Sequence, residues 1–331
     1  MRLKKNILIT GASGSVGIKV FHEFYVRKHK YNITLFLRGS KKNKKLFTNY
    51  REEINIVWGD LRNYNEVEKA VANQDIILHI AGVIPVSEES NPEVTQAVNV
   101  DGTQNIINSM LKQQEKPKII YTSSVAVYGN RVKNPIIKTT DPIRPAKGDF
   151  YAVSKIEAEK LIRNSGLDYC IFRLAYCASP AVLKFHPVMF RMPLNTSIEM
   201  ILTSDIGKAL ANAIEREDIW SKTFNLGGGE SCRIRYGDHL DDLYEIMGLG
   251  RGFMPKEAFS IEGYHCGFYF DEGVQELFNF RNLTLQDFYK EVKKWIGFKR
   301  YLTPLLRWPL RKIFIRKSEY FKEYKKKKDK N

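Results

Sequence analysis

Short apolar runs alternate with segments of helical periodicity along the first 230 residues of the chain. The runs are rich in β-branched residues and apolar on both faces, which is typical of buried parallel strands. We predict strands at 6–10, 33–38, 54–58, 75–81, 118–124, 169–175 and 223–226, and helices near 15–28, 64–72, 92–113, 150–164 and 204–216. These elements predict an α/β fold with a doubly wound parallel sheet, whose ligand lies beyond the carboxyl ends of the strands.

This alternation stops after residue 230. Helical patterns at 238–247 and 285–296 flank irregular sequence that is rich in aromatic residues. We interpret this part as a smaller lobe that closes over the ligand site.

The composition is that of an ordinary globular protein, with 43% hydrophobic and 27% charged residues among 331. It excludes collagen-like, low-complexity and wholly disordered chains. The four cysteines include no C-x-x-C pair and the six histidines no H-x-x-x-H spacing, so we predict neither disulfides nor a metal site. The first residues lead directly into the strand at 6–10, and no run of about 18 apolar residues follows. This predicts a cytoplasmic protein without a signal peptide or a spanning helix.

A glycine-rich turn joins the first predicted strand to the first predicted helix. It contains Gly11, Gly14 and Gly17, three residues apart, with Ser13, Ser15 and Val16 between them. Such a turn lets the backbone approach a pyrophosphate, which the N–H groups and positive dipole end of the helix then bind. The spacing differs by one residue from the G-x-G-x-x-G dinucleotide pattern, and glycines in such turns also serve packing alone. We predict that residues 11–17 hold a dinucleotide cofactor.

The end of the second predicted strand carries Arg38, followed by Ser40 and several lysines. An acidic residue there would bind the adenosine ribose and favour NAD, whereas Arg38 suits the additional 2′-phosphate of NADP. We therefore predict NADP(H) as the preferred cofactor, with NAD(H) as the alternative. A solvated basic turn is the structural interpretation of the same residues.

Five further motifs follow in a recognisable order, at Gly59–Leu61, His79–Gly82, Asn99–Asn105, Tyr121–Gly129 and Tyr151–Lys155. Together with the glycine turn, they resemble the extended short-chain dehydrogenase/reductase family, which includes nucleotide-sugar epimerases and 3β-hydroxysteroid-type dehydrogenases. The resemblance covers roughly residues 5–230 and implies a Rossmann fold.

The resemblance also implies roles for individual cofactor-binding residues. Asp60 and Leu61 would border the adenine, and Asn99 would lie close to the nicotinamide ribose. Three consecutive residues would line the cofactor beside that ribose, namely Ile80, Ala81 and Gly82. One position departs from the pattern, because Arg173 is followed by leucine where family members commonly have proline. This departure leaves the contacts on the nicotinamide side open.

Three residues form the predicted catalytic set. Tyr151 and Lys155 are four residues apart, which places both side chains on one face of a helix. A phenol has an unperturbed pKa near 10, and a nearby ammonium would lower that pKa toward neutrality while also binding the nicotinamide ribose. Ser124, at the end of the fifth strand, would orient the substrate oxygen. Strand alternation would point the competing Ser123 away from the site.

The net charge of +16 is concentrated in residues 299–331, which contain 13 Lys/Arg and 3 Asp/Glu. If this tail is one helix, its apolar residues fall near one side of it: Leu306, Leu310, Ile313, Phe314, Phe321 and Tyr324. We predict that the tail lies on an anionic membrane surface, with Trp308 at the interface and lysines on lipid phosphates. Two alternatives are a last helix packed on the body and a disordered basic arm that binds nucleic acid. The absence of a nucleic-acid-binding pattern in the body disfavours the second.

These observations predict three parts in the chain. They are an NAD(P)-binding Rossmann domain at 1–178, to which 200–229 return, a substrate lobe at 179–199 and 230–298, and the amphipathic tail at 299–331. The apolar segment around His186 and Met189 would either face a hydrophobic substrate or pack within the lobe.

The predicted function is NADP(H)-dependent hydride transfer to or from a secondary alcohol or ketone. The substrate would be a hydrophobic or lipid-linked small molecule, reached from the cytoplasmic face of the membrane. A sugar epimerase with retained NAD and a non-catalytic nucleotide-sensing scaffold are the alternatives. The resemblance leaves a homodimer open, because members of that family often pair through two helices.

Overall fold

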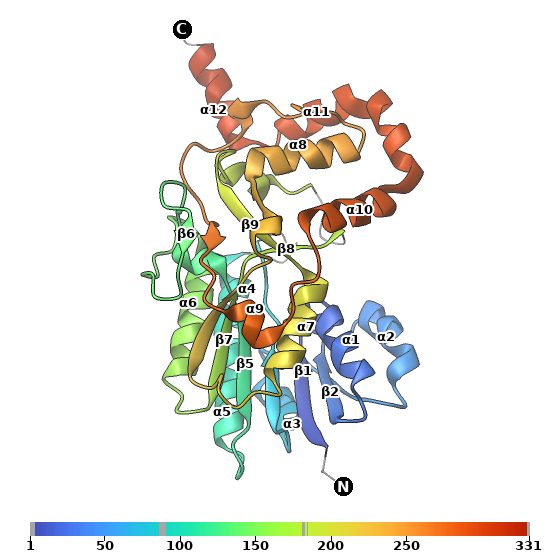
Figure 1. The fold of residues 1–331 in the computed structure, drawn as a ribbon, viewed down its shortest axis with the longest axis vertical. Helices are drawn as coiled ribbons and strands as arrows, with labels where there is room; N and C mark the ends of the chain where they lie inside the picture. The colour runs from blue at the N-terminus through green and yellow to red at the C-terminus, as the bar shows by residue number, and fades with distance from the viewer. Residues whose placement is uncertain (1–3, 86–90, 181–182, 184, 330–331) are drawn as a thin grey trace.

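The core of the protein is a seven-stranded parallel sheet (Figure 1). The computed structural model describes residues 4–85, 91–180, 183 and 185–329. The strands are β1 (Lys5–Thr10), β2 (Tyr31–Leu37), β3 (Asn55–Trp58), β4 (Ile76–His79), β5 (Lys118–Ser124), β7 (Tyr169–Leu174) and β10 (Lys222–Leu226). Their order is β10-β7-β5-β4-β1-β2-β3, and all neighbours run parallel. The predicted doubly wound sheet is confirmed.

Helices cover both faces of this sheet, so its strands are buried on both sides. In β1, Ile7 and Ile9 pack into the core beneath α1 and α7, whereas Leu8 packs into the core beneath α3 and α5. The helices are α1 (Gly17–Val26), α2 (Lys41–Leu46), α3 (Tyr64–Val71), α4 (Pro92–Gln96), α5 (Gly102–Leu111), α6 (Phe150–Arg163) and α7 (Thr203–Ala213). This two-sided burial explains why the strands have no polar face.

The helix predicted at 92–113 is interrupted. A π-helical turn, η2 (Ala97–Asp101), separates α4 from α5 and contains the buried Asn99. Single π-helical turns often occur at functional sites, because they re-aim a side chain that a regular helix would place elsewhere.

A smaller lobe lies over the carboxyl ends of the strands (Figure 1). It contains a three-stranded sheet of β8 (Tyr176–Ala178), β9 (Ser197–Leu202) and β11 (Arg233–Arg235), and β6 (Ile136–Ile137) pairs with β12 (Phe268–Tyr269) beside it. The helical elements of this region are the 3₁₀ turns η5 (Pro187–Arg191) and η7 (Lys256–Ala258), with α8 (Tyr236–Ile246), α9 (Val274–Phe278) and α10 (Leu285–Ile296). The two helices predicted in this region are therefore present, whereas its short strands escaped the sequence pattern.

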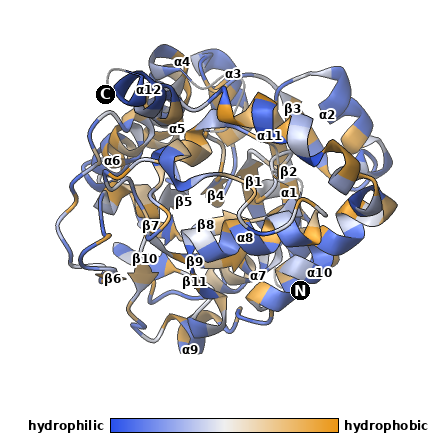
Figure 2. Ribbon diagram, turned by 90° about the horizontal axis from the view of Figure 1, so that it is seen from above, coloured by the Kyte–Doolittle hydropathy of each residue, from blue (hydrophilic) through white to orange (hydrophobic). Residues whose placement is uncertain are grey.

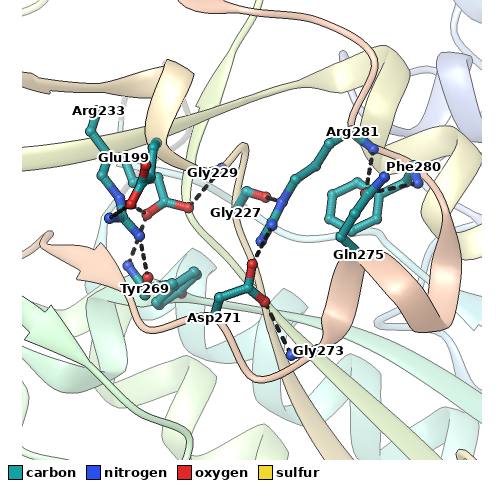
Figure 3. Close-up of polar contacts among 11 residues, drawn as sticks. Glu199, Gly227, Gly229, Arg233, Tyr269, Asp271, Gly273, Gln275, Phe280 and Arg281 are labelled. Carbon is teal, nitrogen blue, oxygen red and sulfur yellow. Dashed lines mark hydrogen bonds and ion pairs between the residues drawn. The ribbon is translucent and has the colours of Figure 1, made fainter.

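A buried carboxylate joins the segments of this lobe (Figure 3). Glu199 is 1% exposed and accepts hydrogen bonds from the backbone N–H groups of Gly229 and Tyr269, both at 3.0 Å. It also pairs with the Arg233 guanidinium at 2.9 Å. Arg281 extends the network by donating to the carbonyl of Gly227. These contacts hold the glycine turn after β10 against β9 and β12.

The tail packs on the lobe as two short helices, α11 (Arg307–Ile315) and α12 (Glu319–Lys328). The predicted single apolar side is not found, because the tail is divided into two helices and its apolar residues differ in burial even within α11. Phe314 stacks on Phe185 with ring centroids 3.8 Å apart, whereas Ile313 is half exposed. Figure 2 shows mixed hydropathy on α11 and a strongly hydrophilic α12. Within the described residues, no helix combines the length and apolar character needed to cross a membrane.

Candidate active site

The loops that follow β1 and β4 touch at the point where the strand order reverses. Gly11 has φ +74°, and a Cβ added there would lie 2.7 Å from the backbone of Ala81. A Cβ added to Gly17 would lie only 2.0 Å from the Gly11 carbonyl oxygen. Two of the three glycines are therefore required by the close backbone approach within and between these loops.

The start of α1 has the features of an anion-binding helix terminus. Val16 occupies the N-cap position, no side chain of the described residues caps this end, and no acidic residue lies in the first turn. Its N–H groups thus lack the side-chain acceptor that usually satisfies them. Ser13, Gly14 and Ser15 belong to the same partly exposed loop. These residues fit the pyrophosphate of a dinucleotide.

A buried hydrogen-bond network fixes the loop after β4. The Thr10 hydroxyl accepts from the N–H groups of Ile80 and Ala81, both at 3.2 Å, and lies 2.9 Å from His79 Nδ1. His79 Nε2 lies 3.0 Å from the Thr103 hydroxyl, which donates its proton to a backbone carbonyl. We therefore assign the ring proton of His79 to Nε2, and Nδ1 accepts from Thr10. Burial lowers the pKa of His79 to about 3, so the ring stays neutral.

Asn99 positions the next part of the same loop. Its Oδ1 accepts from Val83 N at 2.7 Å, and its Nδ2 donates to Val83 O at 3.1 Å and to Ser154 Oγ at 3.0 Å. Gly82 lies beside this amide and beside Lys155, since an added Cβ would be 3.1 Å from Asn99 Oδ1 and 3.4 Å from Lys155 Nζ. The residues predicted to lie beside the nicotinamide ribose are therefore neighbours, and Asn99 links their loop to α6.

The residues predicted to bind the adenosine end lie after β2 and β3. Arg38 is exposed at the end of β2. The Asp60 carboxylate accepts two hydrogen bonds from the Arg62 guanidinium, at 2.9 and 2.7 Å. These bonds are the main reason why the pKa of that carboxyl is lowered, and the positive charge of Arg38 adds a smaller lowering. Leu61 is buried in the core beneath α3 and α5. Arg38 and Asp60 thus share one partly exposed corner of the sheet.

The structure brings the three predicted catalytic side chains together. Tyr151 lies in the first turn of α6 and forms a hydrogen bond with Ser124, at the end of β5. Ser124 also accepts from Ala126 N at 3.2 Å. Ser123 is buried on the opposite side of the strand, near the Glu159 carboxylate. Ser124 is therefore the serine that meets Tyr151.

The electrostatics of this set differ from the sequence expectation. Lys155 Nζ donates to the Thr122 carbonyl at 2.9 Å and lies 4.7 Å from the Tyr121 ring centroid, but 6.0 Å from that of Tyr151. Burial raises the pKa of Tyr151, which outweighs the lowering by its hydrogen bond to Ser124. Burial also lowers the pKa of Lys155 to about 8. The expected lowering of the phenol pKa by the ammonium is therefore not found, because Lys155 turns toward Thr122 and burial keeps Tyr151 protonated.

A second pair of contacts anchors the helix that carries Tyr151. Asp149 caps α6 by accepting from Ala152 N at 3.0 Å, and its other oxygen accepts from His265 Nδ1 of the small lobe at 2.8 Å. The sequence analysis did not single out this pair. The aspartate at the helix start was a readable capping signal, whereas nothing local to His265 revealed its partner.

Arg173, which precedes the position where the chain departs from the pattern, has a structural role. It is 3% exposed and forms a bidentate pair with Glu159 of α6, at 3.0 and 2.7 Å. It also donates to the Tyr128 hydroxyl at 2.7 Å. Arg173 therefore ties β7 to the helix that carries Tyr151 and Lys155.

The amino-acid sequence matches a family of known proteins. The sequence model of the NAD dependent epimerase/dehydratase family matches residues 7–212, which is more than half of the chain. The chain belongs to this family. The predicted membership of the extended short-chain dehydrogenase/reductases, a family of NAD(P)-dependent enzymes, is thereby confirmed.

Individual relatives of this epimerase/dehydratase chain match it only in part. It is 32% identical over 113 residues to rat (Rattus norvegicus) 3 beta-hydroxysteroid dehydrogenase type 7, covering 33% of each chain. It is 32% identical over 161 residues to the N-acetyl-alpha-D-glucosaminyl-diphospho-ditrans,octacis-undecaprenol 4-epimerase of Escherichia coli O157:H7, covering 49% of this chain and 44% of that one. The chain thus spans a third to a half of the length of these curated relatives.

A solved structure shows the same fold over most of the chain. The UDP-glucuronic acid 4-epimerase of Bacillus cereus, in complex with UDP-glucuronic acid and NAD, superposes with a TM-score of 0.72 at 18% identity. The match covers 88% of this chain and 98% of that one. The small lobe therefore belongs to the shared fold of the epimerase/dehydratase family.

A cavity of about 230 Å³ opens beside Tyr151 in this family member. His186 lines it, whereas Met189 packs against the core, so the apolar segment around η5 packs within the lobe and also borders the cavity. That it faces a hydrophobic substrate stays a prediction. Tyr151 is among the residues that line this cavity, which therefore adjoins the predicted catalytic set.

The glycine turn yields a graded prediction. Gly17→Ala places a methyl group 2.0 Å from the Gly11 oxygen, so we expect about 1–3 kcal/mol of destabilisation and at least tenfold weaker NADP binding. Gly14→Ala is the matched control, because its methyl group would lie 3.3 Å from the same oxygen and needs a shift of only a few tenths of an ångström. Thermal unfolding and fluorescence titration with NADPH measure both effects. Equal behaviour of the two variants would contradict the close-approach argument.

Proposed function

We propose that the protein is an NADP(H)-dependent oxidoreductase that interconverts a ketone and a secondary alcohol. The observation that carries this proposal is the meeting of Ser124, Tyr151 and Lys155 beside a cavity, beyond the carboxyl ends of the sheet. The glycine turn at the start of α1 lies at the same edge. A proton-transfer set next to a dinucleotide site is the arrangement that hydride transfer requires.

Each residue has a distinct role in this proposal. The bound nicotinamide supplies or accepts the hydride. Tyr151, protonated at rest, gives its proton to the ketone oxygen as that oxygen becomes a hydroxyl, and takes it back in the reverse direction. Ser124 donates a hydrogen bond to the same oxygen and fixes its position. Lys155, with a pKa near 8, holds the ribose and keeps a positive charge near the phenol at neutral pH.

The preference for NADP(H) is supported by the charges at the adenosine end. Arg38 follows β2, and Lys41, Lys42 and Lys44 are exposed on and around the next short helix. Asp60 is engaged by Arg62 and is not the ribose-binding acid that follows β2 in NAD-preferring sites. A 2′-phosphate therefore meets cations rather than a free carboxylate.

Two observations support a hydrophobic or lipid-linked substrate. The two curated relatives described above are named for a hydroxysteroid and for an undecaprenol-linked sugar. The tail in turn exposes large apolar residues next to basic ones, at Leu305 and Trp308, which are 81 and 71% exposed, and Phe298 just before it is 70% exposed. We infer that this face lies on an anionic membrane surface at the cytoplasmic side, where charge and apolar burial act together.

A sugar epimerase with retained NAD is the second candidate. The identity to the undecaprenol-linked sugar epimerase of Escherichia coli O157:H7 favours it, and the same three side chains would serve an oxidation followed by a re-reduction. The two candidates differ in cofactor handling, since an epimerase consumes no nicotinamide. A nucleotide-sensing scaffold would have no use for the buried Tyr151 and Lys155 pair.

The proton-transfer role of Tyr151 is tested by Tyr151→Phe. We expect NADPH-dependent reduction of a panel of steroid 3-ketones to fall at least ~100-fold, because the ring remains but the transferable proton is lost. NADPH binding should stay within twofold, as followed by fluorescence titration. Parent-like turnover in the variant would exclude Tyr151 as the proton donor.

The membrane-facing role of the tail is tested by a Leu305→Ser/Trp308→Ser double variant. We expect sedimentation with phosphatidylglycerol-containing vesicles to weaken at least ~10-fold, because each exposed apolar side chain contributes about 1.5–3 kcal/mol when buried. Val26→Ser is the control, since Val26 is 71% exposed on α1, outside the tail. High salt should weaken binding of the parent. Unchanged sedimentation of the double variant would remove the membrane proposal.

A further inference from the structure

The tail reaches the cavity beside Tyr151. Lys317, Glu319 and Tyr320, where α12 begins, form one wall of it. The opposite wall comes from α6 and η5 and includes Arg191. The tail lies outside residues 7–212, which the family model matches, and yet it forms part of the cavity that Tyr151 lines.

This position of the tail is held by specific packing. Ser318 is 1% exposed, donates from its hydroxyl to the Ala258 carbonyl at 2.6 Å and accepts from Phe321 N at 3.1 Å. Phe314 stacks on Phe185, which precedes η5. The junction between α11 and α12 is therefore fixed on both sides, and Lys317 projects from a built scaffold.

The charges around the cavity favour an anionic ligand. Arg191 and Lys317 line it from different elements. Arg191 lies over the Tyr264 ring and Lys317 over the Phe185 ring, and no ion pair among the described residues neutralises either cation. The Asp149 carboxylate is engaged by His265 and by the α6 terminus. Burial and the neighbouring Lys317 lower the pKa of His186, which leaves that ring neutral. Glu319 is the one carboxylate of the lining without such a partner among the described residues, and it is exposed to solvent.

We propose that the start of α12 is part of the substrate site, and that Lys317 and Arg191 bind a phosphate group of the substrate whose reacting carbon lies at Tyr151. A phosphate carries more than one acceptor oxygen and more than one charge, so cations from two separate elements can bind it together. The inference rests on the proposed function for the position of the reacting carbon. It adds that the tail both faces the membrane and recognises the substrate.

The phosphate group could belong either to a soluble nucleotide or to a lipid-linked diphosphate. One binding experiment distinguishes these two kinds of substrate. Isothermal titration of the full-length protein, saturated with NADP+, would use UDP and farnesyl diphosphate as probes. We expect Arg191→Ala and Lys317→Ala each to weaken binding about tenfold. Tighter binding of farnesyl diphosphate by the parent assigns the lipid-borne source, and tighter binding of UDP assigns the soluble one.

The matched control is Lys312→Ala, which removes an exposed cation from the same tail outside the cavity, where Lys312 lies over the Trp308 ring. It should bind both probes like the parent. Failure of the parent to bind either probe, or equal affinities in Arg191→Ala, Lys317→Ala and Lys312→Ala, would overturn the inference. Arg191 and Lys317 are both exposed, so melting temperatures near that of the parent verify folding. The titration measures binding and not turnover. Failure of the proposed function would therefore appear in the Tyr151→Phe turnover assay instead.

Discussion

The contact between two loops at the reversal of strand order is the constraint on which the site depends. Gly11 lies against the backbone of Ala81, and Gly17 lies against Gly11, with no room for a side chain at either glycine. Thr10 then holds the Ala81 loop through its hydroxyl, and Asn99 fixes the continuation of that loop on α6. Because these contacts pass from β1 to α6, the glycine turn and the proposed proton-transfer set share one rigid frame.

The helix α6, which carries Tyr151 and Lys155, is the element that the other buried contacts hold in place. Its start is capped by Asp149, which also reaches the small lobe through His265, and its middle is tied to β7 by the Glu159 pair with Arg173. Breaking a buried ion pair of this kind costs several kcal/mol, so the helix cannot shift without losing much of the stability of a domain. Burial in turn keeps Tyr151 protonated, which suits donation of a proton to a ketone.

The sequence predicts the sheet well, because its strands are apolar on both faces and each is followed by a helix of clear periodicity. The proximity of Ser124, Tyr151 and Lys155 is also predictable, since Tyr151 and Lys155 are close in sequence and Ser124 ends a strong strand. Contacts between distant segments were not readable: neither the Asp149–His265 pair nor the packing of Phe314 on Phe185 leaves a local pattern. The tail was also predicted incorrectly, because its helical projection assumed a single helix, whereas Ser318 caps the start of a second one.

The central claim is net hydride transfer with an exchangeable NADP(H). The most direct test is to denature the purified protein, assay the nicotinamide nucleotide it releases, and titrate the emptied protein with NADPH and NADH. We expect little retained nucleotide and tighter binding of NADPH than of NADH. Stoichiometric, tightly held NAD would contradict it and assign the site to an epimerase that recycles its cofactor.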